Sequence, residues 1–173
     1  EKLEKNKNIK QILLTSSTLS SSKILSNLNF KKTIHQFFPI DSQYIVRKFL
    51  NHWKPKLAIF AESEIWPNMI INLNEKKIPK ILINARITKK TFKNWKKISF
   101  YKKIFNSFNL TMPQDSISER YLKKLGSKNI KNVGNLKFCE TKKNLSKNYK
   151  EKVSPILKNK KILFCALSTH EGE

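Results

Sequence analysis

Short apolar runs alternate along the chain with longer segments in which apolar and polar residues are mixed. The runs lie at residues 10–15, 35–40, 57–61, 78–84, 110–112, 130–133 and 161–167. A continuous apolar run is typical of a strand buried on both faces, as in a parallel sheet with helices above and below. Helical patterns fill most of the intervals between the runs. We therefore predict a doubly wound α/β domain.

Residues that start or stop helices stand at the borders of these segments. Pro67 follows the run 57–61 and suits the first turn of a helix, where its missing N–H costs nothing. Asp41, Thr88 and Asp115 each precede a helical pattern as an N-cap would, and Gly126 suits the residue after a helix. The predicted helices cover residues 42–52, 67–75, 88–97 and 116–125.

The pattern also predicts domain limits. A first domain spans residues 1–138, a polar, Lys-rich linker spans 139–159, and the run 161–167 would be the first strand of a second α/β domain covering 160–173. The sequence opens without Met inside a helix-like run and ends just after an apolar run. We therefore expect a piece of a longer chain, with further chain on both sides.

Charge adds a second feature. The formal net charge is +24, and nearly all of it comes from lysine. Lys, Asn and Ile have AT-rich codons, so solvated surfaces account for much of this bias. The alternative is a basic face for phosphates, nucleic acid or anionic lipid, above all in the Lys- and aromatic-rich segment 94–108. No apolar run is long enough to span a membrane.

Polar residues gather where the predicted strands end. These loops are 15–22, 62–68, 84–86 and 134–137, with 168–173 as the corresponding loop of the second domain. In open α/β sheets, ligands bind at this carboxyl edge. With only three glycines, the chain has no G-x-G-x-x-G fingerprint and no P-loop. Cys139 and Cys165 stand alone, which argues against a zinc site or a disulfide framework.

The motif strings are more specific than the fold. Glu62-Ser-Glu-Ile-Trp-Pro-Asn68 resembles the E-T-E-[LI]-W-P-N signature of the 3-deoxy-D-manno-octulosonic acid (Kdo) transferases of lipopolysaccharide synthesis. The likeness continues, in the family's order and at about its spacing, through Ile83–Ile87, Gly134–Phe138 and Ser168–Glu173. It covers essentially the whole chain. One departure is Ser21, which stands where the family's T-T-x-T-x-T-G-S loop has Gly.

The resemblance implies a two-domain glycosyltransferase of the GT-B type, of which this chain holds the Rossmann-like N-terminal domain and the start of the second domain. Such an enzyme transfers Kdo, with inversion, from CMP-Kdo to the lipid A precursor lipid IVA. It works at the cytoplasmic face of the cell inner membrane, against an anionic membrane surface. No metal or other cofactor is implied, no nucleic acid is expected as partner, and this piece alone should be inactive.

The resemblance also assigns site residues. Glu62 and Glu64 are expected to support catalysis, with the presumed base upstream of Glu1, unless one of them caps the helix at Pro67. The expected substrate-binding residues are Thr15, Thr18, Ser22, Asn84, Arg86, Asn135 and Lys137. Those expected on the CMP side are Ser168, Thr169, His170, Gly172 and Glu173.

Two other functions stay open at this point. One is a different GT-B sugar-nucleotide transferase that acts on a lipid acceptor. The other is a basic nucleic-acid-binding α/β module, which explains the charge. That module does not explain Glu62 and Glu64, because paired carboxylates repel a phosphate backbone.

Overall fold

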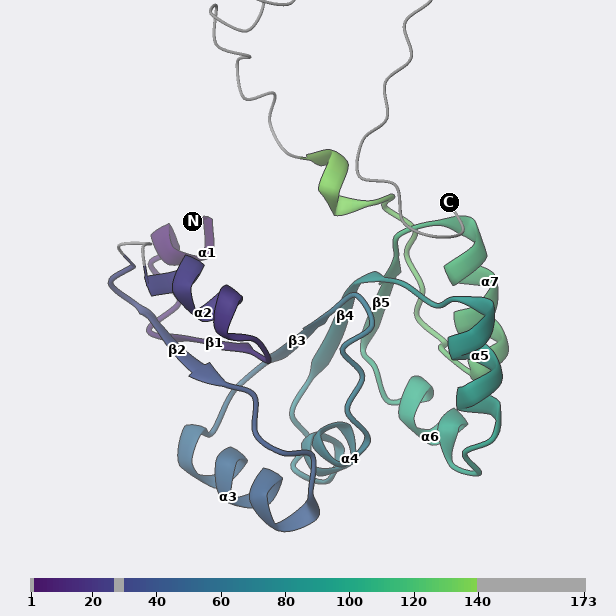
Figure 1. Cartoon of the computed structure of the whole chain (residues 1–173), viewed down its shortest axis with the longest axis horizontal. Helices are drawn as coiled ribbons and strands as arrows, with labels where there is room; N and C mark the ends of the chain where they lie inside the picture. The colour runs from purple at the N-terminus through teal and green to yellow at the C-terminus, as the bar shows by residue number, and fades with distance from the viewer. Residues whose placement is uncertain (1, 27–29, 140–173) are drawn as a thin grey trace, which may run out of the picture. The chain divides into compact units, whose positions relative to one another are not determined.

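The computed structural model in Figure 1 describes residues 2–26 and 30–139. Residues 1–134 form one compact unit, and residues from Asn135 onward belong to a second. Of the second unit, the described residues include one short 3₁₀ helix, η1 (Leu136–Cys139). The fold described below is that of the first unit.

In the described residues, five parallel strands form two sheets. β1 (Ile12–Ser16) pairs with β2 (Thr33–Phe37) in a two-stranded sheet. β3 (Ala58–Ala61), β4 (Lys80–Ala85) and β5 (Leu110–Pro113) form a three-stranded sheet in that order (Figure 1). The predicted α/β class with parallel strands is confirmed, although the strands divide into two sheets where the pattern predicted one.

Helices alternate with these strands along the chain. They are α1 (Lys2–Lys5), α2 (Leu19–Ser26), α3 (Gln43–Trp53), α4 (Pro67–Glu75), α5 (Lys89–Lys96), α6 (Tyr101–Asn106) and α7 (Ser116–Leu125). The segment 94–108 thus contains the end of one helix and the whole of another. The predicted strand 130–133 is reduced to an isolated parallel bridge between Ile130 and Thr111.

Several helix ends follow the sequence signals. Thr88 Oγ1 accepts a hydrogen bond from the N–H of Thr91 at 3.1 Å, and Asp115 Oδ1 accepts one from the N–H of Ser118 at 2.6 Å. Gly126 ends α7 with a φ of 101°, a left-handed conformation that favours glycine. These three caps are confirmed.

The predicted role of Asp41 is wrong. Ser42, one residue later, is the N-cap of α3, and its hydroxyl accepts from the N–H of Ile45 at 3.4 Å. Asp41 instead caps α4: its carboxylate accepts from the N–H of Asn68 at 3.0 Å and of Met69 at 2.9 Å. The N-cap position of α4 is Trp66, whose side chain makes no capping bond, so the first turn depends on a carboxylate from another element.

The core lies on one face of the three-stranded sheet. Leu82 of β4 packs there with Ile70 and Leu73 of α4, Phe105 of α6 and Leu122 of α7, and each of these is at most 1% exposed. The apolar run 57–61 is not buried on both faces as predicted. Ile59 is 49% exposed, because in the described residues the helices cover only one face of this sheet.

Candidate functional site

The backbone brings the ends of β3 and β4 together. The N–H of Glu62 donates to the carbonyl of Ile83 at 3.0 Å, and the N–H of Arg86 donates to the carbonyl of Glu62 at 3.3 Å. On the other side, the N–H of Gln114 donates to the carbonyl of Ala85 at 3.1 Å. Two predicted polar segments, 62–68 and 84–86, therefore meet at the carboxyl edge of one sheet together with Gln114, and this edge is where α/β proteins bind ligands.

Two residues at this edge have a left-handed backbone. Glu62 has a φ of 56° and Asn84 a φ of 50°. Asn tolerates this conformation better than most residues, whereas for Glu it is uncommon. Residues held in sparsely populated backbone regions cluster at functional sites, because the surrounding structure must maintain them. The left-handed turn at Glu62 directs the chain out of β3 and into the loop that carries both carboxylates.

The loop after β4 is held from two sides. Ser63 Oγ donates to the carbonyl of Arg86 at 3.2 Å. The buried hydroxyl of Ser118 accepts from the N–H of Ile87 at 3.1 Å. Ser118 also binds Asp115 through its own N–H, so the first turn of α7 anchors the Arg86 loop. Hydrogen bonds from this turn and from Gln114 outweigh burial and lower the pKa of Asp115.

Glu64 has a partner in its own motif. Its Oε2 accepts a hydrogen bond from the indole Nε1 of Trp66 at 3.0 Å. The same indole stacks on Phe38, with ring centroids 5.0 Å apart. Neither observation makes Glu64 the cap of α4, because Asp41 supplies that cap. The structure therefore places Glu64 as an exposed carboxylate whose orientation is set by the Trp66 ring.

Phe38 connects this edge to the hydroxyl-rich loop, which is the Ser- and Thr-rich segment 15–22. Its N–H donates to the carbonyl of Ser16, the last residue of β1, at 3.0 Å. Of the predicted residues in this loop, Thr15 is half-buried in β1, Thr18 is exposed just before α2, and Ser22 lies within α2. The chain of contacts from Ser16 through Phe38 and Trp66 to Glu64 joins the loop after β1 to the loop after β3.

Four further residues belong to this region although they were not predicted as site residues. Ser63 and Gln114 carry the edge contacts described above. Ser16 Oγ lies 2.8 Å from His35 Nε2 on the neighbouring strand β2. The signals were present in the sequence: Ser63 lies inside the Glu62–Asn68 motif, and His35 begins the apolar run 35–40.

Two predicted substrate-binding residues lie in the second unit. Asn135 Oδ1 accepts a hydrogen bond from the N–H of Lys137 at 3.0 Å, which orders the start of η1. Their predicted role stays a prediction. The predicted CMP-side residues, Ser168, Thr169, His170, Gly172 and Glu173, lie outside the described residues, as do the predicted linker beyond Cys139 and the strand 161–167.

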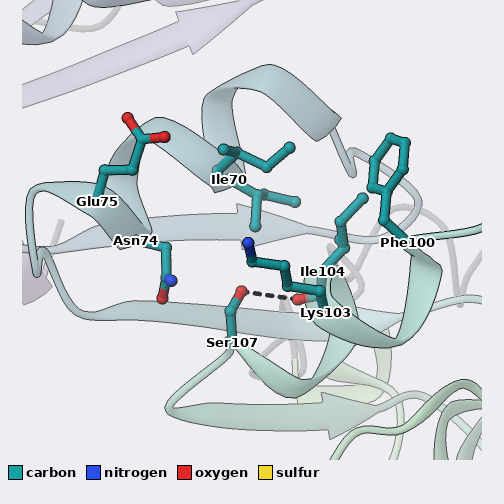
Figure 2. A pocket seen from close by; sticks show the side chains of 8 residues that line it. Ile70, Asn74, Glu75, Phe100, Lys103, Ile104 and Ser107 are labelled. Atoms are coloured by element: carbon teal, nitrogen blue, oxygen red, sulfur yellow. Dashed lines mark hydrogen bonds between the residues drawn. The ribbon is translucent and has the colours of Figure 1, made fainter.

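The cavities of the described residues lie away from this edge. A hollow of about 50 Å³ lies between the second half of α4 and α6, and the exposed side chain of Lys103 extends across it between Ile70 and Ser107 (Figure 2). A larger groove lies at the other edge of the sheet. In the described part of the chain, no three His, Cys, Asp or Glu residues gather in a way that would hold a metal ion. No described helix is both long and apolar enough to cross a bilayer.

Comparison with known proteins gives these loops a family context. The family model for 3-deoxy-D-manno-octulosonic-acid transferase (kdotransferase) matches residues 1–140. That stretch includes the loops around Glu62, Asn84 and the hydroxyl-rich segment. It therefore covers every described residue of the candidate site.

Individual relatives agree with the family model. A 3-deoxy-D-manno-octulosonic acid transferase of Rickettsia typhi is 40% identical over 161 residues, which is 92% of this chain and 34% of the relative. The corresponding protein of Rickettsia prowazekii is 42% identical over 164 residues, 92% of this chain and 34% of that protein. A probable mitochondrial 3-deoxy-D-manno-octulosonic acid transferase of Arabidopsis thaliana is 31% identical over 170 residues, 94% and 38% of the two chains.

The chain spans about a third of the length of these curated relatives. These matches nevertheless cover more than nine tenths of the chain, and the match to the family model includes the motifs that meet at the carboxyl edge. The chain belongs to the 3-deoxy-D-manno-octulosonic acid (Kdo) transferase family.

Proposed function

We propose that this chain supplies the acceptor-side, Rossmann-like domain of an inverting GT-B glycosyltransferase. The enzyme transfers Kdo from CMP-Kdo to the lipid A precursor lipid IVA in lipopolysaccharide synthesis. The observation that carries the proposal is the hydrogen-bonded edge at which Glu62, Ser63 and Arg86 meet. It supports a site that binds polar, anionic sugars, in a chain whose family transfers Kdo.

The chemistry assigns a task to each group. Glu62 and Glu64 are carboxylates that accept hydrogen bonds from sugar hydroxyls and orient them for attack. Arg86 carries a guanidinium whose planar donors match a phosphate or carboxylate. The proton of the attacking hydroxyl needs a carboxylate base, which we place outside this chain. CMP is a good leaving group, so cationic and N–H donors suffice to receive its phosphate, and we propose no cofactor.

The lipid acceptor places the enzyme at the cytoplasmic face of the inner membrane. The structure changes how the segment 94–108 would serve there. Trp95 packs on Phe105 with ring centroids 5.1 Å apart, and the Nζ of Lys96 donates to the hydroxyl of Tyr101 at 2.9 Å. Of the aromatic residues on α5, α6 and the turn between them, Phe100 is the most exposed, at 44%, whereas Phe92 and Trp95 are partly buried. We therefore propose that lysines around Phe100 contact the anionic lipid surface.

A chimaera tests the function directly. Residues 1–173 replace the matching third of the Rickettsia typhi relative, and Kdo transfer from CMP-Kdo to lipid IVA is measured with purified protein. The proposal expects transfer by the chimaera and none by residues 1–173 alone. UDP-sugars are offered in parallel as donors. Transfer from a UDP-sugar, but not from CMP-Kdo, would replace this proposal by another lipid-directed sugar-nucleotide transferase.

Variants of the chimaera test the residues. Glu62→Gln and Arg86→Gln are expected to lower kcat/KM by about tenfold or more, since each removes a charge-assisted hydrogen bond. Lys90→Gln, an exposed change on α5, is the matched control and should leave kcat/KM unchanged. Full activity of both Glu62→Gln and Glu64→Gln would remove these carboxylates from the mechanism.

A further inference from the structure

The amino edge of the three-stranded sheet carries a groove that is separate from the candidate site. It has a volume of about 590 Å³ and lies between the loop that joins α3 to β3 and the loop that joins α4 to β4. Nine residues line it: Leu50, Asn51, Lys54, Pro55, Lys56, Lys76, Lys77, Ile78 and Pro79. Four are lysines and none is acidic. Lysine makes up about one residue in five of the chain, so this lining is enriched in positive charge.

The backbone supplies an independent observation. Lys54 and Lys77 have φ values of 45° and 56°. Helices often end with a residue in this left-handed conformation, and glycine is the residue that adopts it at least cost. In both loops of this groove a lysine occupies such a position. At both positions a lysine side chain is therefore present where the backbone conformation favours glycine.

The lysines are not balanced by neighbouring carboxylates. Glu75 precedes Lys76 in the chain, but its carboxylate lies 3.6 Å from the guanidinium of Arg47, between α3 and α4. The ammonium of Lys76 donates to the side-chain oxygen of Asn51 at 2.7 Å, which links the end of α4 to α3 and leaves the charge of Lys76 in place. The groove therefore presents a positive rim above Leu50 and Ile78.

The helix ends restrict what such a rim binds. α3 and α4 both end at this groove, with Lys54 and Lys76 as their C-caps. The carbonyl ends of helices carry partial negative charge, which attracts the lysines and repels a small anion that enters deeply. A favourable ligand is one that touches the ammonium tips and stays away from the carbonyls. An extended chain with several separate carboxylates fits this requirement.

The lining also distinguishes between polyanions. Proteins that bind single-stranded nucleic acid use aromatic side chains on which bases stack, and the lining contains none. It contains Pro55, Ile78 and Pro79, which suit apolar side chains placed between acidic ones, while Leu50 is buried at 2% exposure. We propose that this groove, which we call the amino-edge groove, is a docking site for an acidic protein segment in which Asp or Glu alternates with apolar residues. The proposal does not depend on Kdo transfer.

Fluorescence anisotropy with a short, fluorescein-labelled peptide of alternating Glu and Leu tests it on residues 1–173. The groove variant carries Lys54→Asn, Lys56→Gln, Lys76→Gln and Lys77→Asn, with Asn at the two left-handed positions to protect the fold. The control variant removes the same charge elsewhere, through Lys89→Gln, Lys90→Gln, Lys128→Gln and Lys131→Gln. We expect the groove variant to bind the peptide about tenfold more weakly or worse, as the loss of several surface ion pairs implies. The control variant should bind within about twofold of the unchanged chain.

Several outcomes would overturn the proposal. An equal loss in both variants would mean that net charge alone attracts the peptide. A peptide that does not bind the unchanged chain in low salt would also overturn the proposal. The proposal would fail as well if the groove variant lost binding to an oligothymidylate, or to vesicles of phosphatidylglycerol, but kept its binding to the peptide. Circular dichroism and thermal unfolding identify a misfolded variant, and the pair Lys56→Gln with Lys76→Gln then repeats the test without touching the left-handed residues.

Discussion

The carboxylate of Asp41 caps a helix that begins 26 residues later, through a hydrogen bond from the N–H of Met69 at 2.9 Å. The neighbouring N–H of Asn68 donates to the other carboxylate oxygen, and the amide of Asn68 donates to the carbonyl of Asp41 at 2.6 Å. A negative charge at a helix N-terminus also interacts favourably with the helix dipole. Asp41 therefore fixes the start of α4, and with it the Glu62–Asn68 loop that precedes this helix.

Replacing Asp41 by Ala should destabilise the fold by about 1–2 kcal/mol, because two N–H groups of α4 lose their acceptor. Ser42→Ala is the matched control. It removes the cap of α3, whose hydrogen bond is longer at 3.4 Å, and should cost less than about 1 kcal/mol. Urea unfolding followed by circular dichroism measures both. A larger loss for Ser42→Ala would mean that the adjacent helix, and not α4, depends more on its cap.

The comparison of Asp41 with Asp115 shows where reading the sequence succeeds. Asp115 and Thr88 cap the helix that follows them, so spacing alone identifies them. Asp41 has the same local signal, but Ser42 takes the local cap and the carboxylate reaches a helix that is close only in the folded chain. Local signals predict local contacts. They do not show that a better acceptor is available one residue later.

Lys80 is a charged residue that lies within the apolar run 78–84. It opens β4 with 2% of its surface exposed, and burial lowers the pKa of its ammonium. Its Nζ donates to the side-chain oxygen of Asn74 at 3.3 Å. A base whose pKa is lowered in the folded state reduces stability at neutral pH, and this loss fades as pH rises towards the unfolded value.

Lys80→Met should therefore stabilise the chain by about 1 kcal/mol near pH 7, since Met fills a similar volume without a charge. The gain over the unchanged chain should shrink as pH rises through the lowered pKa towards 10.5. Thermal unfolding at pH 7, 9 and 10.5 measures the difference. Lys90→Met, at an exposed position, should show no such trend. A gain that is constant with pH would assign the effect to packing rather than to charge.

Glu4 links α1 to the start of β2 through hydrogen bonds. Its carboxylate accepts hydrogen bonds from the N–H groups of Lys32 and Lys31 and from the hydroxyl of Thr33. The backbone hydrogen bond from Lys32 is the largest influence, and it lowers the pKa of Glu4 below 4.5. Because the folded-state pKa is depressed, the stabilisation is complete above the unfolded pKa and is lost as pH falls through the folded one.

Glu4→Gln should lower the midpoint of thermal unfolding at pH 7, and the two proteins should converge as pH falls below 4.5. Glu75→Gln is the control, because Glu75 is an exposed residue whose ion pair with Arg47 is 3.6 Å long. Its effect should be small at every pH. Equal midpoints for Glu4→Gln and the unchanged chain at pH 7 would show that this carboxylate does not hold the two elements together.

The left-handed backbone of Glu62 gives a test that separates conformation from chemistry. At an ordinary position Ala is more stable than Gly, but at a φ of 56° the order should reverse. Glu62→Gly should be more stable than Glu62→Ala by about 1 kcal/mol in urea unfolding. Both variants should lose Kdo transfer in the chimaera, because neither carries the carboxylate. A Gly variant less stable than the Ala variant would contradict the strained turn.

The candidate site was predictable from sequence only in part. That Glu62 and Asn84 lie at strand ends followed from apolar runs that stop at polar residues. Their left-handed φ values did not, because neither residue is glycine. The contact of Ser63 with the carbonyl of Arg86 needs the register of β3 on β4, in which Ala61 lies opposite Ile83. Such pairings arise from the tertiary fold and cannot be predicted from the spacing of residues in the sequence.

Membrane attachment is the property of the proposed enzyme that the lysines of α5 and α6 should influence most. Lys97, Lys102 and Lys103 are exposed around Phe100, whereas the Lys96 ammonium lies 5.0 Å from the centroid of the Tyr101 ring. Each surface lysine near an anionic bilayer contributes about 1 kcal/mol, so changing these three to Gln should weaken binding to phosphatidylglycerol vesicles by about tenfold or more.

The matched control removes the same charge from the amino-edge groove, through Lys54→Asn, Lys56→Gln and Lys77→Asn. Cosedimentation with vesicles measures both variants. Equal losses in the two variants would mean that vesicles respond to net charge alone, and that α5 and α6 have no special place at the membrane.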